Sequence, residues 1–101
     1  MYKPLPDSVV VKESPIHGYG LFATTHLPKG TNLGVSHVYA PGFEGSHIRT
    51  PVGGFINHSD EPNCHKIESP EESMLTYYSL VTSRDIDKYE ELTLTYTLYT
   101  V

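Results

Sequence analysis

No part of the chain carries the apolar spacing of an amphipathic helix, in which hydrophobic residues recur every third or fourth position. The chain instead has short segments rich in β-branched and aromatic residues, separated by glycine and proline. This pattern predicts a mostly β protein and excludes a dinucleotide-binding fold, which needs long helices between its strands. We expect strands over residues 8–12, 21–25, 31–39, 74–82 and 91–99, with a short one beginning at residue 67.

The segments between these strands carry turn signals. Residues 27–30, Leu-Pro-Lys-Gly, predict a tight turn, because proline presets φ and glycine accepts a positive φ. Residues 40–54 are rich in glycine and proline and are expected to be loops. In the third expected strand, alternation with a period of two predicts one shared face for Leu33, Val35, His37 and Tyr39.

Length and charge limit the classes of partner. With 101 residues the chain is expected to form one domain. The formal net charge is -5, and residues 60–101 hold nine carboxylates against Lys66, Arg84 and Lys88. Without a basic patch, direct nucleic-acid binding is not expected, and a basic peptide is the better electrostatic match. No apolar run suits a membrane span or a signal peptide, and Cys64 is the only cysteine, so we expect an intracellular protein without disulfides.

The densest group of chemically capable side chains lies in residues 54–64. Cys64 with His58 or His65 could form a thiol–imidazole pair, and the same three residues could ligate zinc, although a fourth ligand is not evident. Asn57 and His58 could instead hold a polar cofactor. A buried structural thiol is the simpler reading of Cys64, and the segment alone leaves these chemistries open.

Two other segments carry weaker signals. Residues 17–20, His-Gly-Tyr-Gly, predict a turn whose missing side chains would let a ligand approach the backbone. Tyr96 lies in the last expected strand, where a tyrosine is most often a packing residue. Neither signal identifies a function alone.

Taken in order and with their spacing, these segments resemble the SET domain, the fold of protein-lysine methyltransferases. The resemblance rests on residues 14–23, 55–64 and 83–96, with residues 27–30 fitting an intervening turn, and it extends over roughly residues 8–99. It implies small curved β-sheets with a C-terminal pseudoknot, formed by a single domain over residues 8–101 after an arm of residues 1–7. The length is similar to that of minimal stand-alone SET proteins of viruses and bacteria.

The resemblance also implies a cofactor and a reaction. The cofactor is expected to be S-adenosylmethionine, with S-adenosylhomocysteine as product, and no metal is expected. Asn57 and His58 would contact its amino-acid and adenine portions. Tyr96 would be the catalytic residue in the channel that receives the target lysine. The other expected residues are His17, Gly18, Tyr19, Gly20 and Phe55 for cofactor binding, and His37, Tyr39 and Tyr99 for the wall of the substrate channel.

Some residues depart from the family pattern. Tyr89 stands where the last motif usually has glycine, and Thr95 stands where aspartate is frequent. No cysteine-rich segment follows Tyr99, so we expect no post-SET zinc segment and a channel completed by a second copy in a homodimer. The expected substrate is a basic, histone-like protein, in the cytoplasm of a host or bacterium or in a host nucleus. A catalytically weak SET-like module that binds cofactor or peptide is the alternative.

Overall fold

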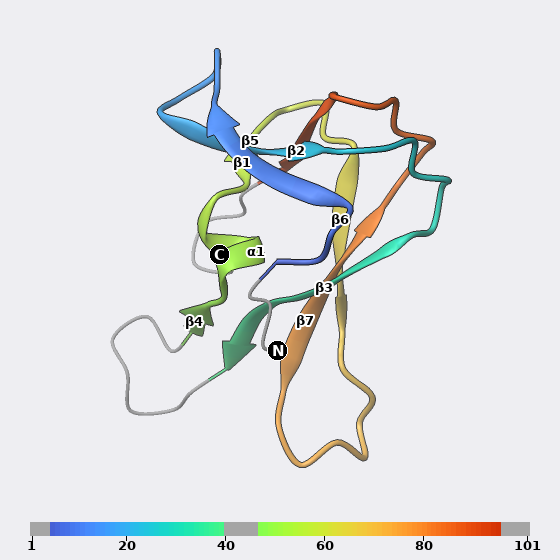
Figure 1. Ribbon diagram of the computed structural model, residues 1–101. Coiled ribbons are helices and arrows are strands. Elements are labelled where there is room, and N and C mark those ends of the chain that lie inside the picture. Colours follow the sequence, from blue (N-terminus) through green and yellow to red (C-terminus); the bar gives the residue numbers. More distant parts are fainter. Residues whose placement is uncertain (1–4, 40–46, 96–101) are drawn as a thin grey trace.

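The structure is a computed structural model that describes residues 5–39 and 47–95. These residues form two small β-sheets and one short helix, α1 (Pro51–Gly54), which confirms the expected mostly β fold class (Figure 1). The first sheet has the order β1 (Val9–Glu13), β2 (Tyr19–Ala23), β8 (Glu91–Leu94) and β5 (Asn57–His58). The second has the order β4 (His47–Arg49), β3 (Asn32–Tyr39), β7 (Tyr77–Thr82) and β6 (Cys64–Glu68).

Strand β8 is the centre of the first sheet. It pairs antiparallel with β2 on one side and parallel with the two-residue β5 on the other, with Asn57 opposite Thr93. The segment at residues 17–20 leads into β2, and the Asn57–His58 pair forms β5, so both motifs lie at strands that flank the same neighbour. This pairing forms part of the expected pseudoknot, while the chain after residue 95 lies outside the described residues.

The buried side chain of Asn63 links the two sheets. Its Oδ1 accepts a hydrogen bond from the Thr93 backbone N at 2.8 Å, and its Nδ2 donates to the Glu91 carbonyl at 2.8 Å. The Asn63 side chain thus satisfies the β8 backbone as a neighbouring strand would. Because β6 follows directly at Cys64, this contact fixes the second sheet against the first.

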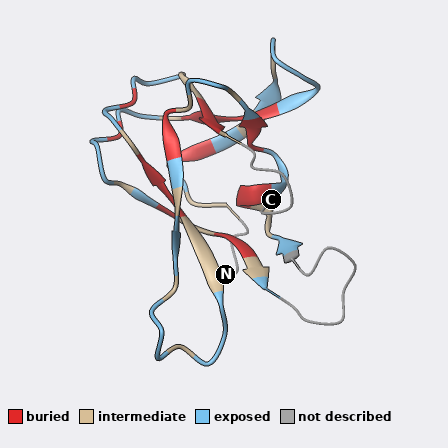
Figure 2. Ribbon diagram, turned by 180° about the vertical axis from the view of Figure 1, so that it is seen from behind, coloured by how far each residue is buried: buried red, intermediate tan, exposed pale blue. Residues whose placement is uncertain are grey.

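The core lies between the sheets, and both contribute to it (Figure 2). Leu21, Leu80, Ile86 and Leu92 are fully buried, and burial of each such side chain stabilises the fold by about 2 kcal/mol. Further members are Val9, Ala23, Leu27, Leu33, Val52, Ile56, Cys64 and Leu94. Among the described residues, no helix has the length and apolar character needed to cross a membrane.

The expectation of loops throughout residues 40–54 was wrong for residues 47–54, which form β4 and α1. Thr50 caps α1 by accepting a hydrogen bond from the Gly53 backbone N, and Pro51 follows at the first helical position, where its missing N–H costs nothing. The Thr-Pro pair is a helix-start signal, but the glycines that follow it oppose a helical prediction.

The predicted single face of β3 was also wrong. Two register irregularities interrupt its pairing with β7, and Gly34 has a φ of 104°. As a result Leu33 is buried, Val35 is only partly buried, and Ser36 and His37 are buried in succession. A bulge reverses the side-chain alternation in β3. Gly34 makes the bulge possible, but the alternation of apolar and polar residues in the sequence does not reveal it.

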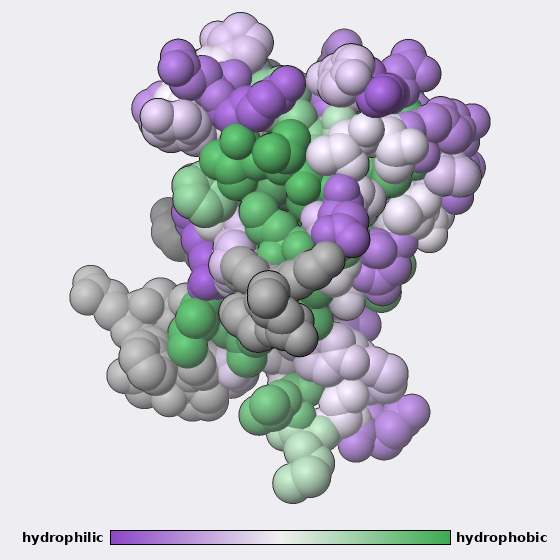
Figure 3. All heavy atoms as spheres, viewed as in Figure 1, coloured by the Kyte–Doolittle hydropathy of each residue, from purple (hydrophilic) through white to green (hydrophobic). Residues whose placement is uncertain are grey.

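Strand β7 begins at Tyr77 rather than at residue 74, and β6 begins at Cys64 rather than at residue 67. The hairpin between them ends where Ser69 Oγ accepts from the Tyr77 backbone N at 3.1 Å. Met74 and Leu75 lie in the connection and are 100% and 65% exposed. Apolar spheres are visible at the hairpin tip in Figure 3, apart from the larger apolar area at the centre of that face.

The turns at Gly30 and Tyr89 require a positive φ. Gly30 takes 85°, as expected for residues 27–30, and its backbone N donates to the Thr82 carbonyl at 2.9 Å. Tyr89 takes 73°, the left-handed conformation that suits the glycine usual at this place. Its ring lies 5.7 Å from Lys12 Nζ and 4.9 Å from Lys88 Nζ, and such cation–π contacts offset part of the backbone strain.

The backbone at Gly30 predicts a stability difference between two glycine substitutions. A Cβ at Gly30 or at Gly54 would meet no atom within 4 Å, but only Gly30 has a positive φ. We expect Gly30→Ala to lower the free energy of unfolding by about 1 kcal/mol, and Gly54→Ala, inside α1, to leave it equal or raise it slightly. Urea denaturation measures both, and equal effects of the two substitutions would contradict the strain argument.

Candidate functional site

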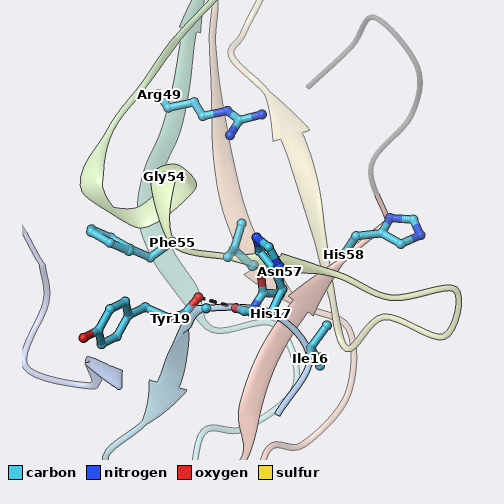
Figure 4. Close-up of a pocket in the computed structure, with 10 residues that line it drawn as sticks. Ile16, His17, Tyr19, Arg49, Gly54, Phe55, Asn57 and His58 are labelled. Atoms are coloured by element: carbon cyan, nitrogen blue, oxygen red, sulfur yellow. Dashed lines mark hydrogen bonds between the residues drawn. The ribbon is translucent and has the colours of Figure 1, made fainter. Parts of the chain in front are cut away.

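A pocket of about 650 Å³ opens where the first sheet meets α1 and β4 (Figure 4). Its lining combines apolar side chains with a few polar ones from three separate parts of the sequence, the composition typical of a small-molecule site. The lining residues are Ile16, His17, Gly18, Tyr19, Arg49, Gly54, Phe55, Ile56, Asn57 and His58.

One wall of the pocket is the loop of residues 14–19, here called the 14–19 loop. The Ser14 backbone N donates to the Gly18 carbonyl at 2.8 Å, and the Ile16 backbone N donates to Ser14 Oγ at 3.0 Å. Gly18 permits this closure because it has a φ of 47°. The loop is therefore a closed turn that carries four of the ten lining residues.

The buried side chain of Asn57 holds the 14–19 loop by direct hydrogen bonds. Its Nδ2 lies 3.1 Å from the His17 carbonyl, 3.2 Å from the Tyr19 carbonyl, 3.1 Å from Ser14 Oγ and 2.9 Å from Glu91 Oε2. The two hydrogens of the amide are shared among these four acceptors. Asn57 is thus both a lining residue and the anchor of the adjacent wall (Figure 4).

The carboxylate of Glu91 lies behind this wall. Ser14 Oγ is 2.8 Å from both of its oxygens. A Cβ on Gly20 would stand 2.3 Å from Glu91 Oε2, so a side chain there would displace the carboxylate. Gly20, expected at the cofactor, is therefore not a lining residue; it provides space for Glu91.

The two ends of the pocket differ in character. Tyr19 and Phe55 place their rings on one side of the pocket (Figure 4). Both residues are exposed, Tyr19 at 60% and Phe55 at 41%. His58 lies on the other side, where its Nε2 is 3.0 Å from Asp60 Oδ1. Arg49, from β4, places a guanidinium at the far end beyond α1. The site thus offers aromatic faces together with imidazole, amide and guanidinium groups.

The structure brings together six of the seven residues expected to bind cofactor: His17, Gly18, Tyr19, Phe55, Asn57 and His58 line one pocket. His37 and Tyr39 do not line it. His37 is buried with its Nδ1 2.8 Å from Ser36 Oγ, and Tyr39 is 39% exposed at the end of β3. Tyr96 and Tyr99 lie outside the described residues. The roles expected for these four residues stay predictions.

Cys64 is a buried thiol, as expected. It is 1% exposed, its Sγ donates to Asn63 Oδ1 at 3.4 Å, and burial raises its pKa to about 12. A thiol of that pKa is a poor nucleophile near neutral pH. Within the described part of the chain, no group of three His, Cys, Asp or Glu side chains could hold a metal ion.

Six site residues were not predicted from sequence as lining or supporting groups: Ser14, Ile16, Arg49, Gly54, Ile56 and Glu91. Ser14 and Glu91 lie inside two of the recognised motifs, but their contact spans 77 positions and no local pattern reveals it. Arg49 lies in the segment expected to be a loop, and Ile16 had no chemical signal. The helix-start signal at Thr50-Pro51 could have indicated that Arg49 precedes an ordered turn.

The contacts of Asn57 predict a strong effect of a nearly isosteric change. Asn57→Asp replaces an amide donor by a carboxylate facing Glu91 Oε2 and two carbonyl oxygens, so the free energy of unfolding should fall by about 2–3 kcal/mol. The control is Asn32→Asp, because Asn32 uses its side-chain oxygen to accept from the Gly34 backbone N and an aspartate can do the same. Chemical denaturation compares the two, and equal losses would contradict this role of the Asn57 amide.

The pKa of Cys64 predicts an alkaline loss of stability. The folded thiol stays neutral to about pH 12, whereas the unfolded thiol ionises from about 9.0, so ionisation favours the unfolded chain between these values. The free energy of unfolding should therefore fall as pH rises from 9 toward 12, with a slope for this group of at most about 1.4 kcal/mol per pH unit. The difference between wild-type and Cys64→Ala denaturation curves isolates the effect, and a pH-independent difference would contradict it.

Comparison with known proteins was made by sequence and by structure. No curated protein sequence matches the chain. The crystal structure of a Plasmodium falciparum "putative histone methyltransferase" is similar with a TM-score of 0.72, at 17% identity, over 92% of this chain and 96% of that one. At that identity the likeness shows the fold alone. The SET domain family model matches residues 39–97, more than half of the chain, which includes the Asn57–His58 pair and Tyr96. The chain therefore belongs to the SET-domain family.

Proposed function

We propose that this SET-domain protein is a protein-lysine N-methyltransferase that uses S-adenosylmethionine. The observation that carries the proposal is the convergence of two motifs on one pocket. The 14–19 loop and residues 55–58 lie far apart in the sequence, yet they form adjoining walls of one pocket beside β8. Family membership supports methyl transfer as the chemistry, and the pocket supplies a place for the cofactor.

The pocket fits a cofactor of this kind. Its volume of about 650 Å³ falls in the range of small-molecule sites, about 300–1,000 Å³. Gly18 presents backbone without a side chain, and a Cβ there would meet nothing within 4 Å, so a ligand can lie against the loop. Bound S-adenosylmethionine would supply a methyl group on a sulfonium cation and leave S-adenosylhomocysteine as product. The residues proposed to hold it are His17, Gly18, Tyr19, Phe55, Asn57 and His58.

The protein's main contribution to rate would be positioning, since methyl transfer to an amine is an in-line displacement. Thr95 Oγ1 donates to the Ser59 carbonyl at 2.7 Å, which ties the end of β8 to the segment after His58. Tyr96 follows directly in the sequence. We propose that its hydroxyl orients the substrate amine. A lysine amine has a pKa of about 10.4 in water, and an apolar channel beside a cation lowers it toward the neutral, nucleophilic form.

The proposed substrate is a basic protein segment of the histone-like type. The chain's net charge of -5, concentrated after residue 60, favours such a partner electrostatically. His37, Tyr39 and Tyr99 are proposed for the substrate channel. We further propose that a homodimer completes the channel, which sedimentation over a range of concentrations tests. An intracellular setting and a viral or bacterial origin, without nucleic-acid or membrane binding, belong to the same proposal.

The proposed role of Tyr96 predicts a loss of rate without a loss of binding. Tyr96→Phe should lower methyl transfer to histone-tail peptides by about 100-fold, because one oriented hydrogen bond in the reacting geometry is removed. Its affinity for S-adenosylhomocysteine by calorimetry should match the wild type. Transfer is measured with the labelled methyl group of S-adenosylmethionine.

The matched control for this experiment is Tyr89→Phe. Tyr89 is 63% exposed, and its contacts with Lys12 and Lys88 use the ring face, which phenylalanine keeps. Tyr89→Phe should leave both S-adenosylhomocysteine binding and methyl transfer unchanged. Wild-type turnover by Tyr96→Phe would remove the proposed role of its hydroxyl.

The alternative is a SET-like module that binds cofactor or peptide with little turnover. The feature that favours this alternative is Thr95, which stands where aspartate is frequent in the family. Its hydroxyl donates to the Ser59 carbonyl. The same measurements separate the two functions. Cofactor binding without transfer from the wild-type protein to any basic peptide would favour the module, whereas absence of cofactor binding would contradict the methyltransferase and leave only a module that binds peptide.

A further inference from the structure

We propose that Glu91 is a positioning residue for the cofactor pocket: its carboxylate holds the 14–19 loop against Asn57 and β8 and thereby sets the affinity of the site. The identity of the ligand rests on the proposed function. The part of the proposal that concerns the loop does not, because it rests on contacts within the protein itself.

The first argument is the set of donors around the carboxylate. Ser14 Oγ is 2.8 Å from both Glu91 oxygens, and Asn57 Nδ2 is 2.9 Å from Oε2. The partners of this partly buried charge are thus a hydroxyl and an amide, one from each wall of the pocket. Hydrogen bonds to an ionised acceptor are about twice as strong as neutral ones, so Glu91 is the strongest link between the two walls.

The second argument is the space left at Gly20. The carboxylate occupies the position beside Gly20 where a side chain would project, with 2.3 Å between a Cβ there and Oε2 and 3.0 Å between that Cβ and Ser14 Cβ. Because the carboxylate ends a flexible side chain, a methyl group at Gly20 would push it away from Ser14 and Asn57 instead of preventing folding. Gly20→Ala should therefore mimic the loss of the carboxylate.

The third argument is what depends on the loop. Ile16, His17 and Gly18 line the pocket and belong to a turn closed by the bonds from Ser14 N to the Gly18 carbonyl and from Ile16 N to Ser14 Oγ, and Tyr19, which also lines the pocket, follows directly as the first residue of β2. Glu91 holds this turn at Ser14, while Asn57 holds it at the His17 carbonyl. Loss of the carboxylate would therefore leave the wall that carries these lining residues with one anchor fewer.

The ligand-free test is amide hydrogen exchange. In Glu91→Ala the Ser14 and Ile16 amides should exchange about 10-fold faster or more relative to amides of β7, whereas the adjacent Glu90→Gln should not change this ratio. Glu90 is the matched control, since its carboxylate pairs with Arg84 and not with the loop. Glu91→Gln, which keeps one acceptor oxygen, should fall between Glu91→Ala and the wild type, and Gly20→Ala should resemble Glu91→Ala.

The ligand test is calorimetric titration with S-adenosylhomocysteine, followed by steady-state kinetics. We expect binding about 10-fold weaker or more in Glu91→Ala and Gly20→Ala, an intermediate loss in Glu91→Gln and none in Glu90→Gln. KM for S-adenosylmethionine should rise while kcat changes little, because Glu91 orders the wall and does not touch the reacting atoms. The double variant with Gly20→Ala and Glu91→Ala should bind little more weakly than Glu91→Ala alone, since the carboxylate that a methyl group at residue 20 would displace is already absent.

Three results would overturn the proposal: a uniform rise in exchange across both sheets, wild-type affinity in Glu91→Ala, or additive effects of the Gly20 and Glu91 substitutions. Failure of the wild-type protein to bind S-adenosylhomocysteine, with exchange increased only in the loop of Glu91→Ala, would contradict the proposed function and leave the role of Glu91 in the loop supported. The two proposals can therefore fail separately.

Discussion

The fold depends on the way the chain satisfies the backbone of β8. This strand has β2 on one side and only the two residues of β5 on the other, and the Asn63 side chain supplies the hydrogen bonds that a longer strand would make. Asn63 also begins the step into β6, so the same contact connects the sheet that carries the pocket with the sheet that completes the core. Removal of the side chain would leave two buried backbone groups of β8 without partners.

The sequence predicted the pocket better than it predicted the elements around it. The residues of the 14–19 loop and residues 55–58 were recognisable because each segment has its own signature of glycines or polar side chains. What holds these segments together could not be read in the same way. The contact between Ser14 and Glu91 joins opposite ends of the chain, and each residue taken alone is an ordinary surface type. Tertiary hydrogen bonds of this kind leave no periodic trace.

The errors in secondary structure have a related cause. The alternation in β3 fails at Gly34, whose positive φ permits a bulge that turns Ser36 and His37 inward. Helix α1 contains two glycines that local propensity disfavours, and Gly53 is required there because a Cβ would lie 2.1 Å from the Ser36 carbonyl. Close packing against β3, which propensity does not describe, decides the residue type. Gly18 and Gly20 differ similarly: the first serves backbone conformation and the second makes room for a carboxylate.

The central place of β8 has a consequence for the order in which the molecule can form. Asn57 and His58 pair with Thr93 and Leu94, and Leu21 and Phe22 pair with Leu92 and Glu91, so neither wall of the pocket can be held before the last described strand exists. During synthesis on the ribosome, β1 with β2 and β6 with β7 can close as hairpins while the chain is still growing. The pocket must wait until residues 91–94 leave the exit tunnel, and long-range pairing of this kind is slow. A nascent chain of this protein therefore cannot hold a formed site while β8 is still unmade, however long the earlier hairpins have been closed.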